Sequence, residues 1–347
     1  MTIFLRCDTG ASYGLGHATR CRTLACALQV QAPEIPLVFV TTTSVLEEVV
    51  HAASTGWRVQ VCGESGAAHW LHWVKAQAQP GDVLIIDMPD HQNGALWATH
   101  IRDKVTVVRL DAPWATPETC DLLVLPGMHH APETVERLDA AFGERLLVGA
   151  DYVMLQEGVP QVRRPFTEHN QRIVFAAGGS DPDQALPLLY EMAHSLSDLI
   201  RAPLRVFCVG AMAEPWTLRP PDMRERITGF SLNEVAYAAL FVTLWGTTVY
   251  EALAMGTPTL TIARTERDAE GAARLEAATE GAVQPLGTLG GLMRETLCYR
   301  LVDLWQERAQ RKRMHYASAG LLDGHGAERV AAAVLGLREK EKPCCPV

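Results

Sequence analysis

The residues with the clearest chemical potential lie in one short stretch near the start of the chain. Gly10, Gly14 and Gly16 follow an apolar run at positions 2–7, and His17 stands where a helical pattern begins. The start of a helix carries unpaired N–H groups and partial positive charge, so it attracts anions. A neutral imidazole can take a proton from water near neutral pH. The stretch therefore predicts an anion site with His17 as a general base, and the alternative is a histidine that only caps a turn.

Two charged side chains accompany His17 in this stretch. Asp8 precedes the glycines and could orient the imidazole or a bound sugar, or it could only cap its own loop. Arg20 lies three residues beyond His17 on the same helical face. It could pair with a phosphate, with Asp8 or only with solvent. The residues alone do not decide between these alternatives.

A second candidate site lies in the stretch 245–258, which reads WGTTVYEALAMGTP. Its two threonines stand at a helix start, where hydroxyl and free N–H groups can hold a diphosphate. A glutamate one turn further in can accept hydrogen bonds from both ribose hydroxyls, although a capping threonine followed by a glutamate gives the same pattern. The nucleotide-binding candidates, in this stretch and in a glycine turn after an earlier strand, are Gly178, Gly179, Ser180, Gly246, Thr247, Thr248 and Glu251.

Short apolar runs alternate with helical patterns along the whole chain, which is typical of parallel sheets covered by helices on both faces. We therefore predict an α/β fold of two doubly wound, Rossmann-like halves, with a ligand cleft between them at the carboxyl ends of the strands. The expected strands are 2–7, 35–41, 57–61, 83–87, 105–110 and 122–125, then 172–176, 204–209, 240–243 and 257–263; the expected helices include 44–53, 67–78, 184–199 and 249–255, with mostly helix after about 268.

A polar, proline-bearing segment at 149–172 predicts the boundary between the two halves. We assign residues 1–160 to a first Rossmann-like domain that carries the histidine loop and residues 171–315 to a nucleotide-binding domain. The segment 316–336 is expected to be helical, and residues 337–347 to form a flexible tail.

Charge, hydropathy and cysteine content exclude several classes of protein. The 347 residues carry a net charge of −9, which argues against non-specific binding to nucleic acids or anionic membranes. No apolar run reaches the roughly 18 residues of a membrane helix, and the start of the chain lacks a basic leader, so we expect a cytoplasmic protein.

The nine cysteines are scattered and fit reduced thiols. The histidines show no metal-ligand spacing, with His129 and His130 expected in a surface loop, so neither metal nor cofactor is expected.

Several motifs, in this order along the chain, resemble one known family. They are the residues Arg6, Asp8, Gly14, Gly16, His17, Arg20 and Cys21, followed by the stretches 149–155, 178–182, 246–258 and 323–329. The resemblance is to the UDP-2,4-diacetamido-2,4,6-trideoxy-β-L-altropyranose hydrolases of pseudaminic acid biosynthesis, which are related in fold to the peptidoglycan N-acetylglucosaminyltransferase and other GT-B enzymes. It runs from residue 3 to about residue 333.

This resemblance implies a GT-B-like fold, a UDP-linked sugar as substrate and hydrolysis by water, with His17 as base and Asp8 beside it. It also implies that segment 316–336 packs back toward the first domain. The residues that it places around the substrate are Arg6, Gly14, Gly16, Arg20, Asp87 and Asp268.

Two segments depart from the family pattern. Asp87-Met88-Pro89 stands where the family has Asp-Ser-Tyr, and Asp268-Ala269 stands where it has Asn-Gln, 13 residues before Gly281. A methionine and a proline cannot replace the hydrogen bond of a phenol, so we expect an altered sugar or altered chemistry at the sugar. The alternative is sequence drift at positions that matter little. A GT-B glycosyltransferase, in which His17 activates an acceptor hydroxyl, and a nucleotide-sugar-binding protein without turnover remain alternatives. The oligomeric state is left open.

Overall fold

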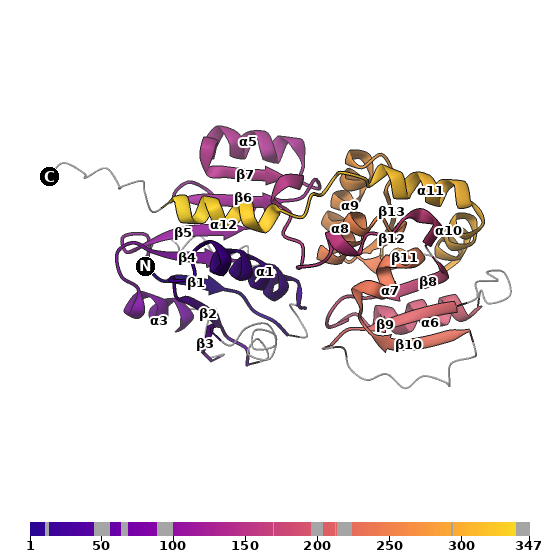
Figure 1. Ribbon diagram of the computed structural model, residues 1–347, viewed down its shortest axis with the longest axis horizontal. Coiled ribbons are helices and arrows are strands. Elements are labelled where there is room, and N and C mark those ends of the chain that lie inside the picture. Colours follow the sequence, from indigo (N-terminus) through magenta and orange to yellow (C-terminus); the bar gives the residue numbers. More distant parts are fainter. Residues whose placement is uncertain are drawn as a thin grey trace.

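Two parallel β-sheets, one in each half of the chain, organise the protein (Figure 1). In this computed structural model the two sheets form lobes that lie side by side, each with helices on both faces. Of the helices in the described ranges, none combines the length and the hydropathy of a membrane span. The structure describes residues 1–10, 14–44, 56–63, 69–88, 100–168, 170–195, 204–211, 213, 224–292 and 294–337.

The sheet of the first lobe has the strand order β3-β2-β1-β4-β5-β6-β7. Alternate residues of β1 face opposite sides, with Leu5 packed in one apolar cluster and Phe4 in the other. The order reverses between β1 and β4, which opens a crevice at the carboxyl ends of these two strands. The elements are β1 (Ile3–Arg6), α1 (Gly16–Gln31), β2 (Leu37–Thr41), β3 (Arg58–Val61), α3 (His69–Gln77), β4 (Asp82–Ile86), β5 (Val105–Leu110), β6 (Leu122–Pro126), α5 (Pro132–Phe142) and β7 (Leu146–Gly149).

The sheet of the second lobe has the order β10-β9-β8-β11-β12-β13 and reverses between β8 and β11. A second crevice therefore lies at the carboxyl ends of those strands. The elements are β8 (Asn170–Ala176), α6 (Ala185–Ser195), β9 (Leu204–Val209), β10 (Glu225–Gly229), α7 (Leu232–Ala236), β11 (Ala238–Leu244), α8 (Thr247–Met255), β12 (Thr259–Ala263), α9 (Glu266–Ala278), β13 (Val283–Thr288), α10 (Arg294–Gln306) and α11 (Arg308–Ala317).

The predicted fold class is confirmed. The observed strands differ from the predicted ones at the edges of the two sheets. Strands β7, β10 and β13 were not expected, and each pairs with a neighbour on one side only. Strand β10 reads ERITG and β13 contains Pro285 and Gly287, so neither shows the continuous apolar run of a central strand. The segment after about residue 268 is mostly helical, as expected, with β13 as an added edge strand. The expected helix at 44–53 lies outside the described residues beyond position 44.

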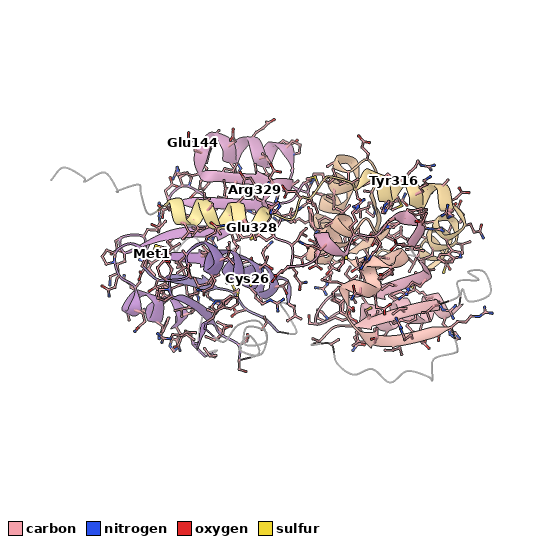
Figure 2. The ribbon with its side chains drawn as sticks, in the orientation of Figure 1. Met1, Cys26, Glu144, Tyr316, Glu328 and Arg329 are labelled. Atoms are coloured by element: carbon pink, nitrogen blue, oxygen red, sulfur yellow. The ribbon has the colours of Figure 1, made fainter. Side chains whose placement is uncertain are left out.

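The end of the described chain returns to the first lobe. Helix α12 (Gly326–Gly336) packs on α1, and its Val330 and Val334 are fully buried in the same apolar cluster as Leu24. Figure 1 shows α12 lying across the first lobe while α10 and α11 cover the second, and Figure 2 labels Glu328 and Arg329 at the end of α12 that faces the second lobe. The chain therefore crosses between the lobes twice, through segments that include residues 150–168 and 318–325.

The contact at the start of α12 yields a stability prediction. A Cβ atom on Gly326 would lie 2.1 Å from the backbone oxygen of Val153, so Gly326→Ala forces backbone atoms apart. We expect it to lower the free energy of unfolding by about 1–3 kcal/mol. Urea unfolding followed by circular dichroism measures the loss. The matched control is Gly336→Ala at the other end of α12, where a Cβ meets nothing within 4 Å. Equal midpoints for the two variants would contradict the packing.

Candidate active site

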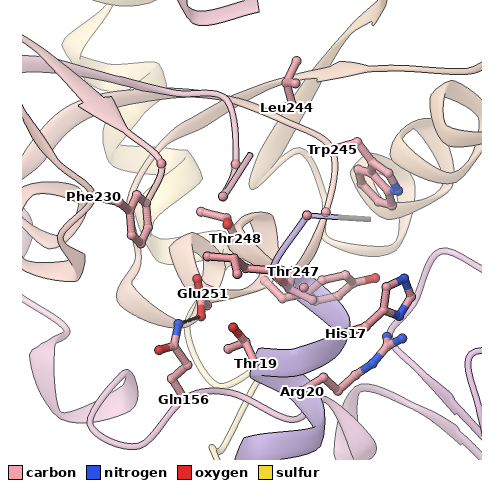
Figure 3. Close-up of a pocket in the computed structure, with 18 of the residues that line it drawn as sticks. His17, Thr19, Arg20, Gln156, Phe230, Leu244, Trp245, Thr247, Thr248 and Glu251 are labelled. Carbon is pink, nitrogen blue, oxygen red and sulfur yellow. Dashed lines mark hydrogen bonds between the residues drawn. The ribbon is translucent and has the colours of Figure 1, made fainter. Parts of the chain in front are cut away.

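A cavity of about 950 Å³ lies between the lobes and is lined by residues from both. Figure 3 shows His17 and Arg20 of α1 approaching it together with Thr247, Thr248 and Glu251 of α8. Three predicted site residues, Arg6, Asp8 and Asp87, are not part of its wall. The predicted residues that line it are Gly14, Gly16, His17, Arg20, Gly178, Gly179, Ser180, Gly246, Thr247, Thr248, Glu251 and Asp268.

A buried carboxylate holds the imidazole of His17. The Nδ1 atom of His17 lies 2.7 Å from Oδ1 of Asp87, which follows β4 and is fully buried. Burial raises the pKa of Asp87, but Arg20 and His17 outweigh this effect and hold it below its usual range. An ionised carboxylate can only accept, so Nδ1 of His17 is the donor in this contact, and the neutral tautomer compatible with it keeps a lone pair on Nε2.

Arg20 joins Asp87 to a further strand end. Its guanidinium donates two hydrogen bonds to Asp87, at 2.7 and 2.6 Å, and one of 3.0 Å to Asp111. Asp111 follows β5, so α1 is tied to the carboxyl ends of β4 and β5. This arrangement corrects two expectations. Asp87 lies behind His17 and outside the cavity wall, and Arg20, which lines the cavity, pairs with Asp87 and Asp111 and not with Asp8.

Arg6 and Asp8 form a separate buried pair. Asp8 accepts two hydrogen bonds from Arg6, at 2.6 and 2.7 Å, and one each from Thr41 and the backbone of Thr42. Burial raises the pKa of Asp8, yet the Arg6 guanidinium and these donors bring it below its usual range. Asp8 therefore ties the end of β1 to the end of β2. The expected roles of Asp8 beside His17 and of Arg6 at the substrate are not supported by this placement.

The start of α8 forms the opposite wall of the cavity. Helix α8 begins at Thr247, directly after β11, and no side chain caps its first N–H groups. A Cβ on Gly16 would lie 3.7 Å from Oγ1 of Thr247, and one on Gly179 would clash with Leu15. Gly179 thus lets the two lobes approach each other closely, whereas a Cβ on Gly16 would make only an ordinary van der Waals contact.

Glu251 lies one turn into α8 and is almost fully buried. Its Oε1 accepts a hydrogen bond of 2.6 Å from Gln156 in the connection between the lobes, drawn as a dashed line in Figure 3. Gln156 in turn accepts one of 3.3 Å from Arg22 of α1. Burial raises the pKa of Glu251. Residues of both lobes and of the connection therefore fix this carboxyl group at the cavity wall.

The cavity also contains residues that the sequence did not single out. His129 lies three residues after β6, and its Nδ1 is 2.7 Å from the hydroxyl of Tyr250. Its ring lies 4.1 Å from that of His130. Burial, followed by repulsion from His130, lowers the pKa of His129 to about 4. These histidines lie in a loop, between β6 and α5, as expected, but the loop is partly buried against the second lobe and not at a free surface. Their position just after a parallel strand could have indicated this.

The two segments that depart from the family pattern occupy different environments. Met88 is partly buried and packs against an apolar cluster of the first lobe, and Pro89 lies outside the described residues. Asp268 lines the cavity, but its carboxylate accepts from the backbone of Thr265 and completes a capping box at the start of α9. One carboxylate oxygen of Asp268 is therefore already engaged within α9.

Comparison with known proteins agrees with this architecture. No protein-family model matches the chain. It is 24% identical over 352 residues to the spore coat polysaccharide biosynthesis protein SpsG of Bacillus subtilis strain 168, covering 98% of this chain and 100% of that protein. This identity leaves the family and the reaction open.

Solved structures of similar shape cover nearly the whole chain. A glycotransferase of kitacinnamycin has a TM-score of 0.67 at 14% identity, over 96% of this chain and 98% of the other. A putative UDP-N-acetylglucosamine 2-epimerase from Listeria monocytogenes has a TM-score of 0.66 at 15% identity, over 99% of this chain and 97% of the other. MnaA of S. aureus, solved with UDP, has a TM-score of 0.64 at 14% identity, over 99% of both chains. The chain thus has the GT-B-like fold of two Rossmann-like domains.

The buried pair of Arg6 and Asp8 yields a second prediction. Replacing Asp8 by Asn leaves the Arg6 charge buried without its partner, so we expect the free energy of unfolding to fall by about 3–5 kcal/mol at neutral pH. The pKa of Asp8 is lowered on folding, so its contribution is present above the unfolded pKa of about 3.9 and is lost as the pH falls further. Urea unfolding at neutral pH and in acid measures both effects.

The matched control is Asp323→Asn, which removes an exposed carboxylate paired with Arg329. Exposed pairs contribute little, so its midpoint should stay close to that of the wild type. A stable Asp8→Asn variant would show that Asp8 does not hold the ends of β1 and β2 together.

Proposed function

We propose that the protein hydrolyses a nucleotide-activated sugar, with His17 as the general base for water. The observation that carries this proposal is the bond between His17 and buried Asp87 on one wall of a cavity whose other wall is the uncapped start of α8. The base and the anion-binding backbone belong to different lobes. A sugar diphosphate placed between them would have its anomeric carbon beside the base and its phosphates beside the donors.

The second lobe would hold the nucleotide. Free N–H groups at the start of α8 and the hydroxyls of Thr247 and Thr248 suit a diphosphate, since both supply donors where the helix dipole is positive. The carboxyl of Glu251 suits the two ribose hydroxyls. The turn at Gly178–Ser180, which faces the same cavity, supplies further backbone donors. A UDP complex of S. aureus MnaA, similar in fold at 14% identity, supports a uridine nucleotide as the first candidate.

The reaction follows from these positions. The Nε2 atom of His17 takes a proton from water as the water oxygen attacks the anomeric carbon, and the bond from that carbon to the diphosphate oxygen breaks. Asp87 holds the imidazole in the tautomer that can accept and stabilises the imidazolium that forms. Arg20 keeps Asp87 ionised. The leaving diphosphate gains negative charge, which the first turn of α8 stabilises.

Glycosyl transfer to an acceptor hydroxyl is the second candidate. It uses the same base and the same leaving group, and the fold shared with a glycotransferase of kitacinnamycin favours it. The two reactions differ in the nucleophile alone. Incubation with UDP-linked amino and deoxy sugars in the absence of any acceptor separates them, since hydrolysis releases free sugar and UDP together. Strict dependence on an added acceptor would replace hydrolysis by transfer.

The assigned base gives a kinetic prediction. Replacing His17 by Gln should lower the rate of UDP release by about 10²–10⁴-fold while the affinity for UDP itself changes little. Asp87→Asn should lower the rate in the same range, because Asn cannot stabilise the imidazolium. The matched control, His325→Gln, changes an exposed histidine at the start of α12 and should keep the wild-type rate. Full activity of His17→Gln would refute the role of His17.

The assigned role of Glu251 gives a binding prediction. Wild-type protein should bind UDP about 10–100-fold more tightly than 2′-deoxy-UDP, because a hydrogen bond to a charged group contributes about 1.5–3 kcal/mol. In Glu251→Gln the difference between the two ligands should shrink while binding of the diphosphate persists. Thermal shifts at matched ligand concentrations measure it, since a ligand that binds only the folded state raises Tm. Equal discrimination in both proteins would show that Glu251 does not contact the ribose.

A further inference from the structure

Three residues with metal-ligating side chains meet beside the wall that carries His17. Asp111, His129 and His130 each offer one ligand atom, and these atoms all lie within 4.8 Å of one another. Asp111 follows β5 and the two histidines follow β6, so neighbouring parallel strands bring them to the same edge of the sheet. The proposed hydrolysis uses none of the three.

The imidazole of His130 has a free coordinating atom. Its Nε2 is buried and has no hydrogen-bond partner, while the backbone of Pro126 acts on the ring as a hydrogen-bond acceptor. An imidazole that donates one N–H to a backbone carbonyl exposes the lone pair of the second nitrogen, which is the usual arrangement of metal-bound histidines. A buried nitrogen without a partner is costly, and a metal ion would satisfy it.

The other two side chains are held in the same manner. The hydroxyl of Tyr250 engages Nδ1 of His129 and leaves Nε2 for a ligand. Arg20 donates a hydrogen bond to Oδ2 of Asp111, which leaves Oδ1 as the oxygen that can coordinate a metal ion. Asp111 also has a φ of 55°, a left-handed conformation that residues other than glycine rarely adopt and that tends to occur at functional sites. Each of the three groups is thus oriented by a partner on its far side.

Three arginines lie near the cluster, and two of them are paired with carboxylates. Arg20 is paired with Asp87 as well as with Asp111. Arg274 lies 3.6 Å from Glu270, and the guanidinium of Arg267 stacks over the ring of Trp114. Local charge therefore does not exclude a cation beside the carboxylate of Asp111.

We propose that Asp111, His129 and His130 bind a divalent transition-metal ion of the zinc type. Two imidazole nitrogens and one carboxylate oxygen suit Zn²⁺ or Co²⁺, whereas Mg²⁺ and Ca²⁺ prefer ligand sets made of oxygen. Three protein ligands leave a coordination position open. Asp111 and His129 line the cavity, so that position faces it and can take a phosphate or hydroxyl oxygen of a ligand.

Titration of the full chain with Co²⁺ tests the site. We expect visible absorption bands of tetrahedral or five-coordinate cobalt that saturate at one ion per chain and disappear when Zn²⁺ is added. An excess of Mg²⁺ should leave them unchanged. The titration uses the Cys344→Ser and Cys345→Ser background, which removes two adjacent thiols of the tail. Absence of the bands, or intense near-ultraviolet bands of cobalt–thiolate bonds in their place, would overturn the proposal.

Variants locate the ion. His130→Ala and Asp111→Asn should each weaken Co²⁺ binding by at least about tenfold, whereas His325→Ala, which removes an exposed histidine near Glu328, should not. Circular dichroism checks that each variant is folded, and if one is not, the other makes the same test. Unchanged affinity in a folded His130→Ala or Asp111→Asn protein would overturn the assignment. The readout is metal binding, so its result does not depend on whether the protein hydrolyses nucleotide sugars.

Discussion

The charge of Asp87 is the constraint on which the first wall of the cavity depends. A fully buried carboxylate is tolerated only where it is paired and hydrogen-bonded, and here Arg20 and His17 supply three contacts. Both partners come from α1, whereas Asp87 follows β4. The same interaction therefore fixes the start of α1 over the crevice between β1 and β4, sets the tautomer of His17 and, through Arg20, reaches Asp111 after β5.

The local elements of this wall were predictable from sequence, but its pairings were not. Apolar runs and glycine turns identify the strand, loop and helix around His17 because those signals are local. Asp8 and Asp87 are both aspartates directly or shortly after a strand, and proximity in sequence favours Asp8 as the partner of His17. The strand order decides otherwise. Strand β2 presents Thr41 and Thr42 to Asp8 on one side of β1, and β4 presents Asp87 to His17 on the other.

The histidines after β6 show a second limit of sequence reasoning. His129 and His130 follow a glycine and precede a proline at the start of α5, a pattern typical of an exposed loop. Tyr250 from α8 reaches this loop from the other lobe and covers it. Contact between the lobes depends on how two sheets are placed in space, and no periodicity within either half of the chain carries that information.

The two walls also differ in how they meet a charged ligand. On the first wall Arg20 is already paired with two aspartates, so its charge is largely neutralised before a ligand arrives, and Arg22 donates to the neutral amide of Gln156. The second wall offers backbone N–H groups at a helix start, which stay free until an anion binds. A diphosphate would therefore be held mainly from the second lobe, and the first lobe is left to hold the base. Gly179, where a Cβ would clash with Leu15 of the first lobe, lets the two lobes approach each other as closely as this division requires.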